Sequence, residues 1–397
     1  MDKKRRFDKI RLPQTCDKWI HYAIMFLTFF GLIMVTSASM GLAVGDNQYL
    51  ARTVIKQFVF SVLGYFGMTF FAHTFSFKVF RRTYWVIWLG TMVALLACLA
   101  FPAVGGAHAW IRIPLPFVEM TIQPSEFAKI STILIMAGYL GDIKIKYKND
   151  LGLIARPVAM VFMFIFVVWF IQDDFGSAVV IGLIALACFM VPSHKQIQGV
   201  QNWLLVFVMA GIVGVVMLLS PLGTTLVQFL PLKDYQKGRI LSAINPFADP
   251  YGDGYQLING LVSFATGGFW GLGFGASVRK YTNFPAANTD FILSIVVEEL
   301  GFFGFLLVFV PYCIIIYRCY KYAMTIRSEK HKMVLVGTAF YLIIPFVFNV
   351  GGVTGLIPLT GVPLLMISAG GSSTMSLMVC IGISQAVISS YNKGEVL

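Results

Sequence analysis

Long apolar runs separated by short polar segments extend along almost the whole chain. Ten runs, each of roughly 20 residues, are long enough to cross the hydrocarbon core of a membrane as helices. They lie near residues 19–40, 54–72, 83–101, 124–140, 156–171, 174–191, 203–221, 290–317, 333–350 and 363–388. Each run is continuously apolar, whereas the strands of a membrane barrel alternate between apolar and polar residues. The pattern therefore predicts an all-α polytopic membrane protein.

The composition supports the same conclusion. Of the 397 residues, 58% are hydrophobic and only 12% are charged, and the mean hydropathy is +0.79. A soluble core cannot cover so much apolar surface, so residues 1–397 are expected to form a single integral membrane domain. The six cysteines show no CxxC spacing, so neither a disulfide framework nor a zinc site is predicted.

The basic residues predict the orientation of the chain. Placing the amino terminus in the cytoplasm puts 21 of the 30 Lys and Arg residues on the inner side, as the positive-inside tendency requires. Both termini are then cytoplasmic, and residues 1–18 form a basic inner tail. The net charge of +12 reflects this bias and attraction to anionic lipid, not a nucleic-acid surface. No cleavable signal peptide is expected, because the first apolar run is already long enough to span a membrane.

Two outer loops are longer than the others. The first covers about residues 102–123, and the second, about 222–289, is the one large extracellular loop. The second loop is too short and too rich in glycine for an independent domain, so we expect short helices folded over the mouth of the bundle. Its segment 257–274 is amphipathic, which suits the membrane interface. No internal repeat is evident, so an inverted-repeat transporter is not supported.

Asp290 is the first candidate for chemistry. It stands where the second outer loop re-enters the membrane, ahead of an apolar run that only Glu298 and Glu299 interrupt. A carboxylate is costly at the edge of a lipid phase, so one held there is a functional candidate by default. The alternative is that Asp290 merely caps the next helix, a role that Thr289 could also fill.

A second candidate opens the fourth apolar run. Glu126 and Lys129 are three residues apart, so on a helix they share a face and can neutralise each other. One interpretation is a buried ion pair that only fixes helix packing. The other is a cation at Lys129 that Glu126 positions for an anionic substrate.

Asp174 and Arg239 are further candidates with two interpretations each. Asp174 lies between the fifth and sixth runs, where it can either cap a helix or bind substrate. Arg239, in the second outer loop, can hold a pyrophosphate through its fork of donors, or tie the loop down through a carboxylate.

A series of short motifs in one order and spacing resembles the SEDS family (shape, elongation, division and sporulation), the peptidoglycan polymerases of FtsW and RodA type. The resemblance covers nearly the whole chain. The motifs are Gly106-Ala107 with Trp110-Ile111; Gln123-Pro124-Ser125-Glu126 with Ala128-Lys129; Asp174-Phe175-Gly176-Ser177-Ala178; Arg239-Ile240; Asn245-Pro246; Asp249-Pro250; Gly254-Tyr255-Gln256; Thr289-Asp290-Phe291-Ile292; Glu298-Glu299-Leu300-Gly301; residues 355–364; and Ser368-Ala369-Gly370-Gly371-Ser372-Ser373.

The resemblance implies a SEDS-type bundle that polymerises lipid II on the outer face of the bacterial cytoplasmic membrane. It implies that Asp290 is the catalytic base. The residues implied for substrate binding and pyrophosphate positioning are Lys129, Glu126, Arg239, Asp174, Ser125, Gln123, Glu299 and Ser368. A divalent cation, Mg²⁺ or Mn²⁺, could assist, although no dedicated ligand cluster is evident. The implied partner is a class B penicillin-binding protein, a transpeptidase with a single membrane anchor.

The chain departs from the family pattern near the candidate base. Ala286 and Asn288 stand where the family usually has Glu and His, which leaves Asp290 more isolated as a proton acceptor. Asp173 replaces a usual proline, and Ala369 replaces a usual aromatic residue. The stretch 273–280 is closer to the division and sporulation branch than to the elongation branch.

The main alternative function is a lipid II flippase or transporter, because a membrane bundle with buried charge suits both activities. A flippase needs charged residues through the middle of the membrane, and few are found there. The candidate catalytic groups gather instead at the outer mouth, which favours a polymerase. A scaffold that only recruits a partner is less well supported, given the number of polar groups near lipid depth.

Overall fold

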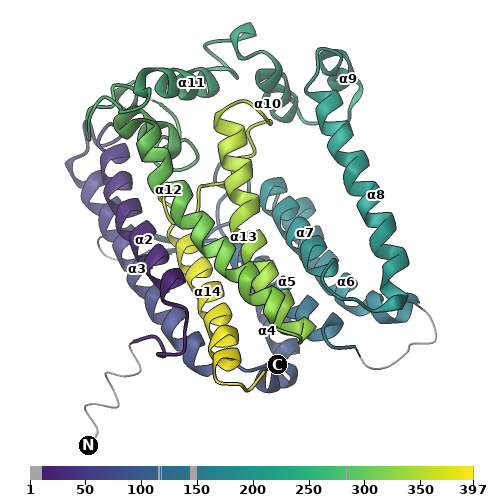
Figure 1. Ribbon diagram of the computed structural model, residues 1–397. Helices are drawn as coiled ribbons and strands as arrows, with labels where there is room; N and C mark the ends of the chain where they lie inside the picture. Colours follow the sequence, from purple (N-terminus) through teal and green to yellow (C-terminus); the bar gives the residue numbers. More distant parts are fainter. Residues whose placement is uncertain (1–10, 115–116, 118, 144–149, 283, 397) are drawn as a thin grey trace, which may run out of the picture.

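The computed structural model describes residues 11–114, 117, 119–143, 150–282 and 284–396. Within that part, ten main helices cross the molecule in alternating directions, and the described chain begins and ends at the same end of the bundle (Figure 1). They are α2 (Lys18–Ser39), α3 (Asn47–Thr74), α4 (Phe77–Ala97), α5 (Pro124–Leu140), α6 (Asp150–Phe166), α7 (Phe175–Phe189), α8 (Lys195–Leu218), α12 (Ile292–Thr325), α13 (Glu329–Val353) and α14 (Gly371–Asn392). In the described part of the chain, eight helical segments are long and apolar enough to cross a membrane, while α5 and α7 are shorter, at 17 and 15 residues. The predicted all-α fold is confirmed.

The core of the bundle lies around α13 and α14. α14 packs along α3, α12 packs against α2 and α13, and α5 packs against α7 and α13. Nearly every side chain of α14 is buried. α8 is the exception at the side of the bundle, because Ile197 is its only buried residue (Figure 1). The remaining apolar side chains of α8 are therefore exposed or half-buried at the surface of the bundle.

Short elements form the outer end of the molecule. The large loop folds into α9 (Gly223–Phe229), α10 (Asp234–Ile244), η3 (Pro246–Ala248), α11 (Tyr255–Gly267) and η4 (Arg279–Tyr281). The first outer loop, after η1 (Cys98–Ala100), forms an antiparallel pair of strands, β1 (Ile111–Pro114) and β2 (Glu119–Ile122). A short π-helix, η2 (Val167–Ile171), ends the α6 crossing.

The predicted start of the last span was wrong. α14 begins at Gly371, whereas the hydropathy pattern placed its start near residue 363. Residues 354–370, which we call the re-entrant loop, are irregular because the backbone takes positive φ angles at Gly355, Gly361 and Met366. Its segment 364–367 is buried and as apolar as a helix, so hydropathy alone cannot separate the two. The predicted start of the seventh span was also late, since α8 begins at Lys195.

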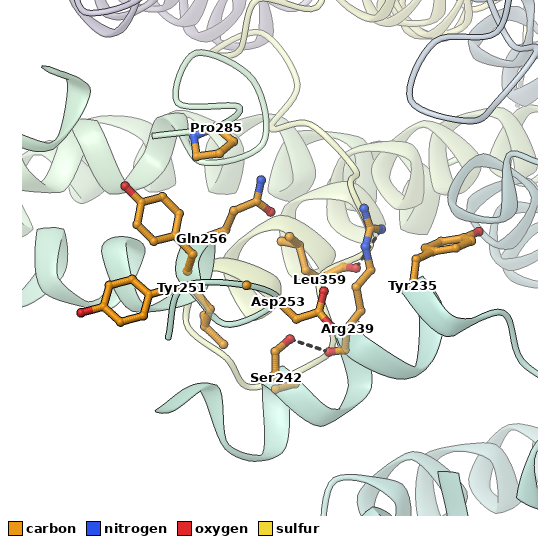
Figure 2. Close-up of a pocket in the computed structure, with 12 residues that line it drawn as sticks. Tyr235, Arg239, Ser242, Tyr251, Asp253, Gln256, Pro285 and Leu359 are labelled. Atoms are coloured by element: carbon orange, nitrogen blue, oxygen red, sulfur yellow. Dashed lines mark hydrogen bonds between the residues drawn. The ribbon is translucent and has the colours of Figure 1, made fainter. Parts of the chain in front are cut away.

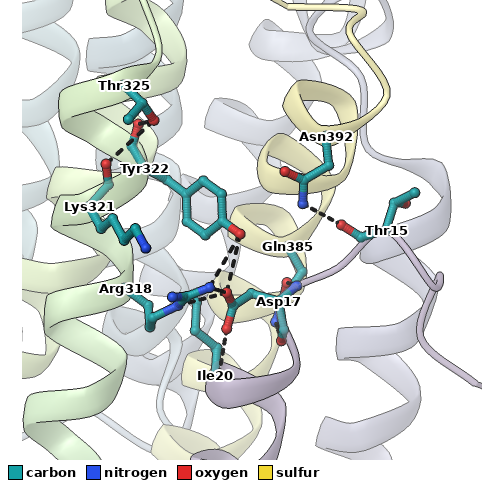
Figure 3. A network of polar contacts seen from close by, with 9 residues as sticks. All are labelled: Thr15, Asp17, Ile20, Arg318, Lys321, Tyr322, Thr325, Gln385 and Asn392. Atoms are coloured by element: carbon teal, nitrogen blue, oxygen red, sulfur yellow. Dashed lines mark hydrogen bonds and ion pairs between the residues drawn. The ribbon is translucent and has the colours of Figure 1, made fainter.

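The amino-terminal segment is tied to the inner ends of two distant helices (Figure 3). Asp17 accepts hydrogen bonds from Arg318, at 2.7 Å from Nε, and from the Tyr322 hydroxyl, at 3.2 Å, both on α12. Its backbone exchanges two hydrogen bonds with the Gln385 amide on α14. The first crossing helix is thereby fastened to the last. Several of the predicted inner-side basic residues (Lys3, Lys4, Arg5, Arg6, Lys9, Lys144, Lys146 and Lys148) lie outside the described residues.

Candidate active site

Asp290 lies in a tight turn just before α12. The backbone N–H groups of Thr289 and Phe291 both donate to the carbonyl of Ala286, at 3.0 and 3.1 Å. The Phe291 ring packs on Phe284 in the core, and this contact holds the turn in place. No side chain of the described residues caps the first turn of α12, so a capping role for Asp290 is not supported. Among the described residues, none donates a hydrogen bond to the Asp290 carboxylate.

Arg239 of α10 faces Asp290 across the re-entrant loop. Its guanidinium donates to the carbonyl of Leu359 at 3.1 Å, and no carboxylate of the described residues lies within ion-pair distance of it. A Cβ atom added to Gly361 would lie 3.6 Å both from Arg239 Nη1 and from Asp290 Oδ2. Gly361 has a φ of 72°, a conformation that glycine adopts without strain. The missing side chain leaves room between the two charged groups.

Burial changes the acidity of Asp290. Loss of hydration raises the pKa of this carboxyl to about 6, and the opposing effect of the Arg239 charge keeps it from rising further. The group is therefore mostly ionised at neutral pH. A base whose pKa lies close to the working pH is well matched to taking a proton from an alcohol during the reaction.

Asn349, near the outer end of α13, holds this arrangement together. Its buried amide donates to the carbonyl of Asp290 at 2.7 Å and to the carbonyl of Val362 at 3.0 Å. It therefore joins the Asp290 turn to the re-entrant loop beside Gly361. Sequence reasoning missed Asn349, and the only available signal was an amide close to the end of an apolar run.

Gln123 and Asp174 meet on the opposite side of the same loop. Asp174 caps α7 by accepting from the backbone N–H of Ser177 at 3.0 Å, and it also accepts from the Gln123 amide at 2.8 Å. Gly176 approaches the re-entrant loop so closely that an added Cβ would lie 3.1 Å from the Thr360 carbonyl. The structure thus brings both predicted residues to the loop that carries Gly361.

Lys129 and Glu126 form a buried ion pair inside the bundle. Lys129 Nζ lies 2.7 Å from Glu126 Oε1, and the two side chains are only 3% and 2% exposed. The Tyr341 hydroxyl donates to Glu126 Oε2 at 2.7 Å, while Lys129 Nζ lies 5.4 Å from the centre of the Tyr341 ring. The charge of Lys129 is therefore already compensated by the protein, and no contact of the described residues joins this pair to Asp290.

Glu298 and Glu299 fasten the large outer loop to α12. Glu299 lies 2.8 Å from Lys280, accepts from the Ser37 hydroxyl at 2.7 Å, and has no exposed side-chain surface. Glu298 accepts from the Ser277 hydroxyl at 2.6 Å. Both carboxylates thus have protein partners from the loop, and Glu299 is not brought to Asp290.

The two predicted serines are buried away from any exposed surface. Ser368 donates to the Leu364 carbonyl within the re-entrant loop, and Ser125 lies in the first turn of α5 without a hydrogen-bond partner among the described residues. The described residues contain no group of three His, Cys, Asp or Glu side chains that could bind a metal ion.

A cleft of about 400 Å³ opens beside Arg239 at the outer end of the molecule (Figure 2). Its walls come from α10, from the turn before α11 and the first turn of that helix, from Pro285 and from the re-entrant loop. The polar and aromatic lining residues are Tyr235, Arg239, Ser242, Tyr251, Asp253, Tyr255 and Gln256. Tyrosine rings with nearby amide and carboxylate groups suit a ligand with both apolar faces and hydroxyl groups, such as a sugar.

Comparison with known proteins identifies the class to which this fold and site belong. The sequence profile of the FtsW/RodA/SpoVE family, described as cell cycle proteins, matches residues 18–393. The chain is 32% identical to the probable peptidoglycan glycosyltransferase FtsW of Bacillus subtilis over 376 residues, covering 94% of this chain and 90% of the relative. It is 30% identical to that of Francisella salina over 383 residues, covering 95% and 90%. The chain therefore belongs to the FtsW/RodA/SpoVE family.

Solved structures share the fold. A chain from a peptidoglycan synthase complex superimposes with a TM-score of 0.70 at 22% identity, covering 95% of this chain and 99% of that one. The rod shape determining protein RodA of Thermus thermophilus superimposes with a TM-score of 0.61 at 20% identity, covering 94% and 97%. The fold and the predicted family are both confirmed.

Proposed function

We propose that this protein is a peptidoglycan glycosyltransferase that polymerises lipid II on the outer face of the bacterial cytoplasmic membrane. The observation that carries the proposal is the pairing of Asp290, a half-buried carboxylate without a hydrogen-bond donor among the described residues, with Arg239 across the space left by Gly361. Arg239 lines the outer cleft, whereas Asp290 does not line it and faces Arg239 across Gly361. A base and a cation paired in this way are what a glycosyl transfer with an anionic leaving group requires.

In the proposed reaction, the 4-hydroxyl of the acceptor sugar attacks the anomeric carbon of the growing chain. The new bond joins that oxygen to the anomeric carbon, and the bond from the anomeric carbon to the pyrophosphate oxygen breaks. Asp290 takes the hydroxyl proton, and undecaprenyl pyrophosphate leaves with its electron pair. Arg239 stabilises the negative charge that develops on the leaving group.

The other site residues take supporting roles in this proposal. Asn349 positions the backbone of Asp290, and the Gln123–Asp174 pair supports the re-entrant loop from the other side. The remaining predicted residues support the site from within the bundle. They are Lys129, Glu126, Ser125, Glu299 and Ser368. Mg²⁺ or Mn²⁺ at the pyrophosphate would draw its ligands chiefly from phosphate oxygens and water, since no ligand cluster is present among the described residues.

The partner in this proposal is a class B penicillin-binding protein, which crosslinks the glycan strands. The similarity to a chain of a complex that coordinates polymerization and crosslinking supports it. The similarity to curated proteins named FtsW supports a role in the division branch.

Reconstitution separates the polymerase from the flippase. The purified protein is placed in liposomes with labelled lipid II, with and without a co-purified transpeptidase. Glycan strands long enough to resolve on a gel support the proposal. Movement of lipid II across the bilayer without any polymer would replace it with the flippase.

The pH dependence of polymerisation should report the ionisation of Asp290. Because the base form is active and its pKa is about 6, kcat/KM is expected to rise with pH through about 6. Arg239→Met removes the charge that lowers this pKa, so the rise should move to higher pH. Arg239→Lys keeps the charge and serves as the matched control. A profile that is the same in Arg239→Met and in the unaltered protein would contradict the assignment.

Two variants separate the packing role of Lys129 from a catalytic one. Lys129→Met leaves Glu126 buried without its cation, which should destabilise the protein by about 3–5 kcal/mol. Adding Glu126→Gln removes the unpaired charge and should restore the melting temperature. If polymerisation needs the charge of Lys129, the double variant stays inactive on lipid II. Full activity of the double variant would mean that the pair serves packing alone.

A further inference from the structure

An exposed loop of apolar residues follows α11. We call residues 268–275 the glycine loop, because four glycines alternate in it with four large apolar residues, Phe269, Trp270, Leu272 and Phe274. These four side chains are 58%, 78%, 48% and 58% exposed. All four glycines have positive φ angles, which residues with a side chain rarely adopt.

The glycine loop is joined to α12 through backbone hydrogen bonds at a break in that helix. Gly301, with φ 66° and ψ −159°, interrupts the helix and frees the neighbouring backbone groups. The N–H groups of Leu272 and Gly273 donate to the carbonyls of Glu298 and Glu299, both at 2.9 Å, and the N–H of Phe302 donates to the Gly268 carbonyl at 2.9 Å. The loop is thus held at the level of Gly301.

The charges of α12 place this level at the outer edge of the membrane. No charged residue occurs from Leu300 to Tyr317, and the run is bounded by Glu299 and Arg318. The 16 residues after the break, Phe302 to Tyr317, form about 24 Å of helix, enough to cross most of the hydrocarbon thickness of a bilayer. Gly301 therefore lies where the hydrocarbon core meets the outer headgroups.

From this geometry we infer that the glycine loop is an interfacial anchor that binds outer-leaflet phospholipids at the boundary between headgroups and acyl chains. Trp270 suits this boundary because its ring is apolar while its indole N–H can donate to lipid oxygens. Phe269 lies 5.8 Å, ring centre to ring centre, from Phe302, an exposed residue of α12 just inside the membrane. The apolar surface of the loop is therefore continuous with the lipid-facing surface of the helix.

The glycine loop is connected to a wall of the outer cleft through α11. The glycine loop directly follows α11, and the turn before α11 lines the outer cleft. Binding of the loop to lipid would hold that wall of the cleft at a fixed height above the bilayer. The inference does not depend on which reaction occurs in the cleft.

Fluorescence quenching tests the anchor in the full-length protein. The protein is placed in nanodiscs of phospholipids that carry bromine either high on the acyl chain or near its end. The difference in emission between the unaltered protein and Trp270→Phe isolates the signal of Trp270. We expect stronger quenching of this signal by the shallow bromine than by the deep one, and little quenching by aqueous iodide.

Trp203 provides a matched control of the same residue type. It is 68% exposed on α8 and lies eight residues from Lys195 at the inner end, about 12 Å along the helix axis. Its difference signal, obtained with Trp203→Phe, should be quenched more by the deep bromine.

Three results would overturn the anchor. Quenching of Trp270 by iodide but by neither lipid would mean a solvent-exposed loop. Stronger quenching by the deep bromine would mean a buried segment, not an interfacial one. Loss of lipid quenching when a single-span transpeptidase is co-purified would mean that this face binds a protein partner.

Discussion

Replacing Asp290 by asparagine is expected to lower lipid II polymerisation by about 100-fold or more, because the amide keeps the size of the side chain but cannot accept the proton. The half-buried carboxylate lies in a fixed turn, and the main change is the loss of its basicity. The measurement is the rate of glycan formation by the purified variant in liposomes.

Asp173→Asn is the control for this result. Asp173 is on the same outer side, but it forms an exposed ion pair with Lys233 at 2.7 Å, and such pairs contribute little. This variant should polymerise at the rate of the unaltered protein. If Asp290→Asn were as active as Asp173→Asn, another group would have to be the base.

Gly301→Ala is expected to destabilise the protein strongly, because it adds a methyl group where the backbone conformation needs glycine. The backbone angles at Gly301 fall in a region that is essentially restricted to glycine, which alone costs about 1–3 kcal/mol. The added Cβ would also lie 2.3 Å from the Phe269 carbonyl, so the glycine loop would have to separate from α12. We expect a clear fall in melting temperature in detergent, together with loss of activity.

Gly90→Ala is the matched control for the helix break. Gly90 lies within α4, and an added Cβ would meet no atom within 4 Å. Alanine favours a helix over glycine by about 1 kcal/mol, so this variant should melt at the same or a slightly higher temperature. Equal melting temperatures for Gly301→Ala and the unaltered protein would show that the break does not need glycine.

The sequence was sufficient to predict the bundle because each main helix corresponds to a continuous apolar run. It was not sufficient to predict where some of them begin. Residues 363–370 look like part of a span, but the positive φ angles at Gly361 and Met366 fold them into a loop. Backbone geometry of this kind depends on contacts between segments far apart in the chain, and hydropathy does not report them.

The candidate site was predicted in part for the same reason. Asp290 and Arg239 could be selected from the sequence, because a charge beside an apolar run is conspicuous. Their placement across Gly361 could not, since it requires the re-entrant loop to pass between them. Asn349 was overlooked because one amide in an apolar run resembles a packing residue, and its two carbonyl partners are visible only in three dimensions.

The ties between the amino-terminal segment and α14 have a consequence for biosynthesis. Asp17 and Gln385 are 368 residues apart, so they meet only when the ribosome has nearly finished the chain. Until then, the backbone of Asp17, which precedes the first helix, lacks its hydrogen-bond partner on α14. The end of the bundle that holds Asp17 therefore closes only after α14 has been made, and a nascent chain that stops early leaves it open.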